Sequence, residues 1–161
     1  MNNPLWSYIF NQNKSSNTLI ATLSKQPIFE KLTQKELRFI EKMMHIRQYK
    51  KEELIFKQGE PGAALYIIQK GEIKIYLEEN DTHLATILEG HFFGEIALLD
   101  NSPRTASASA QKETTLLVIS NVDLDVISER NPKLGLKIVR SIGKLLAQRL
   151  SFANEQLIQK A

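Results

Sequence analysis

Short apolar runs separated by turn residues fill the middle of the chain and restrict its fold more than any other feature. The runs are rich in β-branched and aromatic side chains, and glycine, Asn-Asp or proline stands between them. Many short strands with frequent turns are typical of an antiparallel sandwich or barrel. The clearest hairpin turns are Lys70-Gly71 and Asn80-Asp81. The predicted strands cover residues 53–56, 64–70, 72–78, 83–88, 107–110 and 114–119.

Helical patterns precede this β region. Apolar residues recur at helical spacing between Asn17 and Met44, and Pro27 divides them into two pieces. Thr33 begins the sequence Thr-Gln-Lys-Glu, a capping box that predicts the start of the second helix. A short leading helix is expected before residue 11, joined to the body by a polar linker over residues 11–17.

The C-terminal part of the chain is also expected to be helical. A short helix is predicted over residues 122–130, Asn131-Pro132 ends it, and a long helix runs from Lys133 towards Lys160. The expected organisation is an N-terminal helical extension over residues 1–26, a β body with flanking helices over residues 27–130, and a C-terminal helix over residues 131–161.

Size and composition exclude several classes of protein. A chain of 161 residues fits one domain with helical extensions and leaves no room for a second, catalytic domain. It has no cysteine, and its three histidines lack metal-ligand spacing, so neither a disulfide nor a metal centre is expected. The N-terminus does not resemble a signal peptide and no apolar stretch reaches membrane-spanning length, which predicts a cytoplasmic protein. The net charge of +3 is too small to predict a nucleic-acid surface.

A glycine turn, a carboxylate and a guanidinium occur close together in Phe92-Phe-Gly-Glu-Ile-Ala-Leu-Leu99 and the following Pro103-Arg-Thr-Ala106. Gly94 allows the backbone to approach a ligand closely, and the N–H groups of a helical turn that follows it attract phosphate. Arg104 offers a charged fork that matches two phosphate oxygens. Glu95 repels phosphate but can accept a hydrogen bond from a ribose hydroxyl. The motif therefore predicts a ligand that combines a sugar with a phosphate.

These residues resemble the phosphate-binding cassette of the cyclic nucleotide-binding domains. Upstream, Gln58-Gly-Glu-Pro-Gly62 and Leu65-Tyr-Ile-Ile-Gln-Lys-Gly-Glu-Ile-Lys-Ile-Tyr76 are similar to the glycine turn and hairpin that precede the cassette in that family. The resemblance extends over residues 27–126 and keeps the family's order. It implies an α+β, mainly β fold: an antiparallel β-roll of the jelly-roll type with a cassette helix, N-terminal helices and a long C-terminal helix. No activated nucleophile, paired carboxylates or metal ligands accompany the motif, so no enzymatic reaction is expected.

The resemblance implies a role for each residue of the cassette. Arg104 is expected to hold the cyclic phosphate, and Glu95 is expected to accept a hydrogen bond from the ribose 2′-hydroxyl. Thr105 is compatible with cAMP and with cGMP, and cAMP is favoured because no further guanine-specific contact is apparent. The predicted nucleotide-binding residues are Phe93, Gly94, Glu95, Ile96, Ala97, Arg104, Thr105 and Ala106, with Ile87 and Arg149 as candidate base contacts.

The long C-terminal helix carries an apolar stripe that another surface must cover. The stripe consists of Val139, Ile142, Leu146, Leu150, Ala153 and Leu157. It can pack against the protein's own body, or it can form a homodimer seam through residues 139–157, and the sequence leaves both readings open. We expect a sensor or regulatory module that signals to a downstream protein partner. The alternative function is a docking protein of the same fold that binds no nucleotide.

Overall fold

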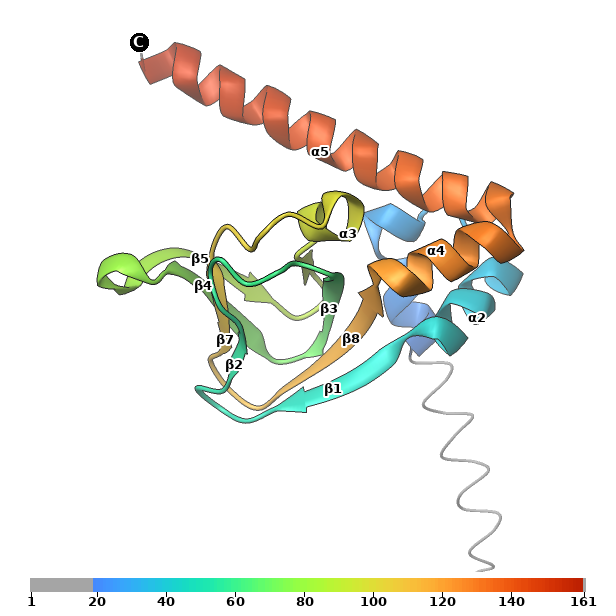
Figure 1. The fold of residues 1–161 in the computed structure, drawn as a ribbon, viewed down its shortest axis with the longest axis horizontal. Coiled ribbons are helices and arrows are strands. Elements are labelled where there is room, and N and C mark those ends of the chain that lie inside the picture. The colour runs from blue at the N-terminus through green and yellow to red at the C-terminus, as the bar shows by residue number, and fades with distance from the viewer. Residues whose placement is uncertain (1–18, 161) are drawn as a thin grey trace, which may run out of the picture.

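Two four-stranded antiparallel sheets form the body of the protein in a computed structural model that describes residues 19–160 (Figure 1). The first sheet has the strand order β1-β8-β3-β6 and the second has the order β2-β7-β4-β5. In chain order, a helical segment over residues 19–24 is followed by η1 (Pro27–Phe29), α2 (Gln34–Met43), β1 (His45–Tyr49), β2 (Leu54–Phe56), β3 (Ala64–Lys70), β4 (Glu72–Leu77), η2 (Glu79–Asp81), β5 (Thr82–Leu88), β6 (Phe92–Phe93), α3 (Ile96–Asp100), β7 (Ser107–Ala110), β8 (Thr114–Ser120), α4 (Asn121–Arg130) and α5 (Pro132–Lys160).

The centre of the first sheet is buried on both faces. Ile67 pairs with Leu117 across β3 and β8, and both side chains belong to a cluster shared with the helices. Their neighbours Ile68 and Leu116 also pair with each other, but they belong to a second cluster that includes Ala108 of the other sheet. Successive strand residues point to opposite faces. The sheet therefore lies between the helices on one side and the second sheet on the other, which confirms the predicted antiparallel β-roll.

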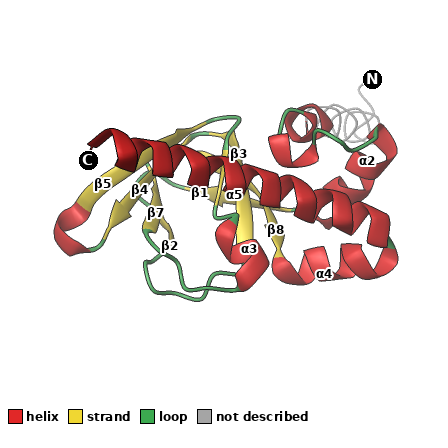
Figure 2. Ribbon diagram, turned by 90° about the horizontal axis from the view of Figure 1, so that it is seen from above, coloured by secondary structure: helices red, strands yellow, loops and turns green. Residues whose placement is uncertain are grey.

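Most of the helices pack together on the outer face of the first sheet, whereas η2 lies between β4 and β5 and buries no residue. Figure 2 shows α5 running along the molecule with α4 beside its first turns. The α2 N-terminus has the predicted capping box: the Thr33 backbone N–H donates to Glu36 Oε2 at 2.7 Å, and the Glu36 N–H donates to Thr33 Oγ1 at 3.3 Å. Glu36 also accepts from Lys137 Nζ at 2.7 Å, which joins α2 to α5. The buried residues that the helical parts contribute to the cluster shared with the first sheet are Ile20, Leu23, Ile28, Phe29, Leu37, Ile40, Leu98, Leu124, Ile127, Leu134, Ile138 and Ile142.

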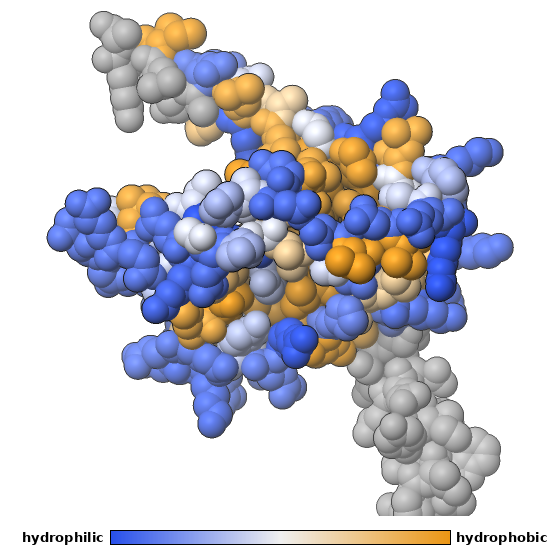
Figure 3. Space-filling view, viewed as in Figure 1, coloured by the Kyte–Doolittle hydropathy of each residue, from blue (hydrophilic) through white to orange (hydrophobic). Residues whose placement is uncertain are grey.

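The apolar stripe of α5 divides between two environments. Ile142 is fully buried in the helical cluster, and Leu146 packs partly against it. Leu150, by contrast, is 63% exposed, and apolar side chains are visible along α5 in Figure 3. The other stripe residues are Val139, which is exposed, and Ala153 and Leu157, whose side chains lie outside the described part of the chain.

Two strands were not expected from the sequence. In β1, Arg47 and Gln48 interrupt the apolar pattern, and the strand forms through its pairing with β8. The two residues of β6 form a strand only by pairing with Tyr66 and Ile67 of β3. Both elements depend on a neighbour that is distant in the sequence, so local periodicity does not predict them. The leading helix and linker expected before residue 18 lie outside the described residues.

Candidate functional site

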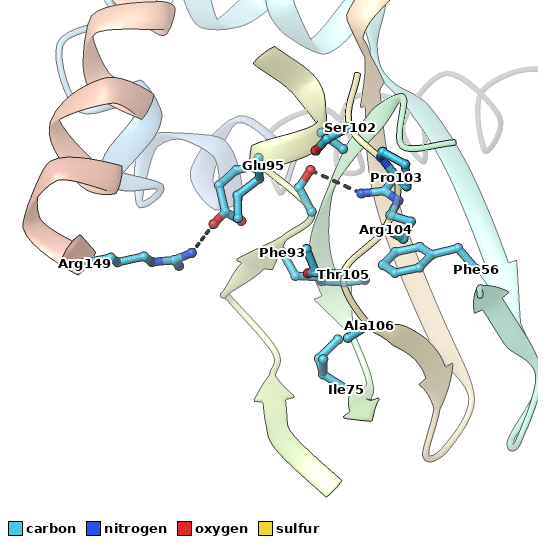
Figure 4. Close-up of a pocket in the computed structure, with 13 residues that line it drawn as sticks. Phe56, Ile75, Phe93, Glu95, Ser102, Pro103, Arg104, Thr105, Ala106 and Arg149 are labelled. Carbon is cyan, nitrogen blue, oxygen red and sulfur yellow. Dashed lines mark hydrogen bonds and ion pairs between the residues drawn. The ribbon is translucent and has the colours of Figure 1, made fainter. Parts of the chain in front are cut away.

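A pocket of about 240 Å³ lies where the β6–α3 turn meets the segment before β7 (Figure 4). One side chain from α5 also reaches its wall. The pocket is lined by Phe56, Ile75, Phe93, Gly94, Glu95, Ile96, Ala97, Ser102, Pro103, Arg104, Thr105, Ala106 and Arg149. The fold therefore brings together the two halves of the sequence motif, together with residues from three other elements.

Gly94 makes the turn that leads into α3. Its φ of +81° lies in the left-handed region, which residues other than glycine rarely adopt. A Cβ at this position would also lie 2.8 Å from Arg104 Nη1 and 3.0 Å from the Ala64 carbonyl oxygen. Glycine is thus required here for its backbone conformation and for the space that the arginine occupies.

Arg104 is the charged centre of the pocket. Its side chain is buried, with the residue only 7% exposed, and Nη2 donates to the Ala64 carbonyl at 2.9 Å while Nη1 donates to the Gly94 carbonyl at 3.3 Å. Its guanidinium carbon lies 4.1 Å from the centre of the Phe56 ring. Burial lowers the pKa of Arg104, but an arginine remains protonated at neutral pH. Nε is buried and has no hydrogen-bond partner among residues 19–160, which leaves one donor of a buried cation available.

The loop before β3 holds Arg104 in place through its backbone. The Gly59 N–H donates to the Arg104 carbonyl at 2.8 Å, and the Arg104 N–H donates to the Glu60 carbonyl at 2.8 Å. Gly62 lies so close to α3 that an added Cβ would overlap with the Cβ of Ala97. The upstream glycine turn noted in the sequence therefore packs against both Arg104 and α3 and fixes their positions.

Glu95 is buried at the start of α3, with 3% of its surface exposed. Its carboxylate does not cap the helix. Instead, Glu95 Oε1 accepts a hydrogen bond from Arg149 Nη1 of α5 (Figure 4). The Arg149 guanidinium carbon is also 5.7 Å from the centre of the Phe92 ring. A carboxylate of the cassette and a cation of the C-terminal helix thus form one ion pair at the edge of the pocket.

All the predicted site residues except Ile87 line this pocket. Ile87 lies partly buried against the cluster between the sheets. The sequence reasoning did not single out Phe56, Ile75 or Ser102. For Phe56 and Ile75 the only signal was their place in predicted strands, whereas Ser102 directly precedes the Pro103-Arg104 motif. Arg149 was selected as a base contact, and the structure places its guanidinium at Glu95.

Within residues 19–160, no group of three or more histidine, cysteine, aspartate or glutamate side chains could hold a metal ion. The same part of the chain has no helix that combines the length and the apolar character needed to cross a membrane.

Sequence comparison identifies relatives that share this motif region. A sequence model described as the cyclic nucleotide-binding domain matches residues 46–131, more than half of the chain. The chain is 36% identical over 117 residues to a proposed potassium channel protein of Rhodopseudomonas palustris, covering 72% of this chain and 28% of that protein. It is 32% identical over 134 residues to the cyclic AMP receptor protein of Thermus thermophilus, covering 81% of this chain and 60% of that protein. The chain therefore spans less than two thirds of the length of either relative.

Solved structures share the architecture. A cyclic nucleotide-binding domain from Methylobacillus flagellatus superimposes with a TM-score of 0.76 at 24% identity, covering 92% of this chain and 85% of that one. The catabolite activator protein of Thermus thermophilus gives a TM-score of 0.73 at 31% identity, covering 83% of this chain and 62% of that one. Because the sequence match includes the cassette and nearly all of the β-roll that presents it, this chain belongs to the cyclic nucleotide-binding domain family.

Proposed function

We propose that this regulatory domain binds cAMP in the pocket beside α3, with cGMP as the alternative ligand. The observation that carries the proposal is Arg104, a buried cation that lines the pocket and has a free Nε donor within the described structure. A cyclic phosphate has one negative charge and two exposed oxygens, so it would satisfy both the charge and the donor. One relative of this chain is named as a cyclic AMP receptor, which supports cAMP as the first ligand to test.

Glu95 suits the sugar of the same ligand. In Figure 4, Glu95 stands on the side of Arg149 and Arg104 stands on the side of Phe56. The pocket therefore has an electropositive side and a side with a carboxylate that accepts hydrogen bonds. A nucleotide would place its phosphate at Arg104, with the backbone N–H groups of Ile96 and Ala97, and its ribose 2′-hydroxyl at Glu95.

The proposed signal is a change in the position or stability of α5. This helix supplies Arg149 to the pocket, and its first half is anchored in the helical cluster by buried residues such as Ile142. A ligand can shift α5 only if it interacts differently with its alternative positions. The exposed Leu150 and Val139 are proposed to meet a second copy of the chain or a downstream protein. A cytoplasmic location belongs to the same proposal.

Calorimetric titration of nucleotide-stripped protein with cAMP and with cGMP tests this function. The parent should bind at least one of them, and Arg104→Lys should bind about ten- to a hundredfold more weakly, because a charged hydrogen bond contributes roughly 1.5–3 kcal/mol and the lysine lacks the planar fork. Thermal unfolding of both proteins shows whether the variant is folded.

The outcomes separate this function from its rival. A parent that binds neither nucleotide would contradict the proposal and favour a docking protein of the same fold. A folded Arg104→Lys variant that binds as tightly as the parent would instead show that the phosphate lies elsewhere.

A further inference from the structure

The ion pair between Glu95 and Arg149 joins two elements that are far apart in the sequence. Glu95 lies at the start of α3, and Arg149 lies in the second half of α5, where its side chain is 53% exposed. Among the hydrogen bonds and ion pairs of residues 19–160, Arg149 is the one side-chain partner of the Glu95 carboxylate. The orientation of a buried carboxylate is therefore set by a helix outside the β-roll.

The carboxylate retains hydrogen-bonding capacity beyond this pair. An ionised carboxylate has two oxygens and about four acceptor positions, and the hydrogen bond from Arg149 uses Oε1. A sugar hydroxyl is a neutral donor. If it displaced the Arg149 guanidinium, the buried Glu95 carboxylate would lose its cationic partner, which is unfavourable. A hydroxyl that joins the pair gains an acceptor already held in place.

We infer that Arg149 is a positioning residue for recognition of the ribose 2′-hydroxyl, acting through Glu95 rather than through the base. This inference rests on the proposed function. The guanidinium orients the carboxylate, and the oriented carboxylate accepts the hydrogen bond from the sugar. Discrimination between ribose and deoxyribose nucleotides then depends on α5 being docked over the pocket.

The test compares the affinities of cAMP and 2′-deoxy-cAMP for the parent, for Arg149→Ala and for Arg140→Ala. Arg140 is an exposed cation of the same helix that does not line the pocket, so it controls for the loss of charge from α5. The parent should prefer cAMP by about tenfold or more, the value of one well-placed hydrogen bond to a charged group. In Arg149→Ala this preference should fall to about twofold or less, mainly through weaker binding of cAMP. The Arg140→Ala variant should keep the parent's preference, and Arg149→Lys should restore part of it.

Each other outcome overturns the inference. If Arg149→Ala weakens both nucleotides equally, Arg149 contacts the base or phosphate. If it strengthens both, Arg149 competes with the ligand for Glu95. If the parent binds cAMP and 2′-deoxy-cAMP equally well, the sugar contact is absent while the proposed function stands. If the parent binds neither cAMP nor cGMP, the proposed function fails together with the inference that rests on it.

Discussion

The geometry of Gly94 predicts that alanine at this position damages the site more than alanine at Gly90. The two glycines have nearly the same φ, +81° at Gly94 and +82° at Gly90, and both lie in the left-handed region. A Cβ at Gly90 would have no heavy atom within 4 Å, whereas a Cβ at Gly94 would lie 2.8 Å from Arg104 Nη1. The Gly90→Ala variant therefore provides the cost of the backbone strain without the crowding.

The expected losses of stability follow from the backbone strain and from the crowding. A left-handed conformation costs an alanine roughly 1–2 kcal/mol, partly offset by about 0.4–1 kcal/mol from the reduced entropy of the unfolded chain. Gly90→Ala should therefore lose up to about 1.5 kcal/mol in free energy of unfolding. Gly94→Ala adds overpacking against the arginine and the Ala64 carbonyl, which brings a further loss of about 1–3 kcal/mol. It should also weaken cyclic nucleotide binding by about tenfold or more, because the displaced guanidinium would lose its proposed charged hydrogen bond to the phosphate.

Urea unfolding and calorimetric titration of the two variants measure both effects. Gly90→Ala should bind nucleotide like the parent. If Gly94→Ala equals Gly90→Ala in both stability and affinity, then the close approach of Gly94 to Arg104 has no energetic role and the reasoning is wrong.

Two other features give testable predictions. Gly62→Ala should push α3 outward, because the new Cβ would overlap with the Cβ of Ala97. We expect the free energy of unfolding in urea to fall by about 1–3 kcal/mol and nucleotide binding to weaken. An unchanged free energy of unfolding would contradict the role of Gly62 in positioning α3. The hydrogen bond from Lys137 holds the pKa of Glu36 below its ordinary value, so this pair stabilises the fold above the unfolded-state pKa of about 4.5 and the stabilisation disappears as the pH falls through the lower folded-state pKa. Glu36→Gln should remove that part of the acid dependence of the free energy of unfolding, and a pH profile identical to that of the parent would exclude the coupling.

Much of the pocket around Arg104 could be predicted because its residues are close in the sequence. Gly94 and Arg104 are ten positions apart, and the turn between them has a recognisable motif. The strand β3 also appears at its predicted bounds, because a short apolar run between turn residues is a local signal. The capping box at Thr33 is local in the same way.

The parts that could not be predicted depend on contacts between distant segments. Phe56 reaches the pocket because β2 pairs with β7, and nothing in its own strand indicates that it lies 4.1 Å from a guanidinium. The pairing of Glu95 with Arg149 joins residues 54 positions apart. The helical spacing of α5 was clear in the sequence, but which of its residues face the pocket depends on how the helix packs on α4 and η1.

The two arginines differ in a way that affects how binding can become a signal. Arg104 is buried and fixed by the backbone carbonyls of Gly94 and Ala64, so its proposed contribution to phosphate binding would not require α5. Arg149 is half exposed and belongs to α5, so its contribution exists only while the helix is docked. A ligand shifts an equilibrium by its differential affinity for the two states, not by its total affinity. On the proposed function, the phosphate contact would therefore supply most of the binding free energy, whereas the sugar contact at Glu95 and Arg149 would set how strongly a bound nucleotide favours the docked helix.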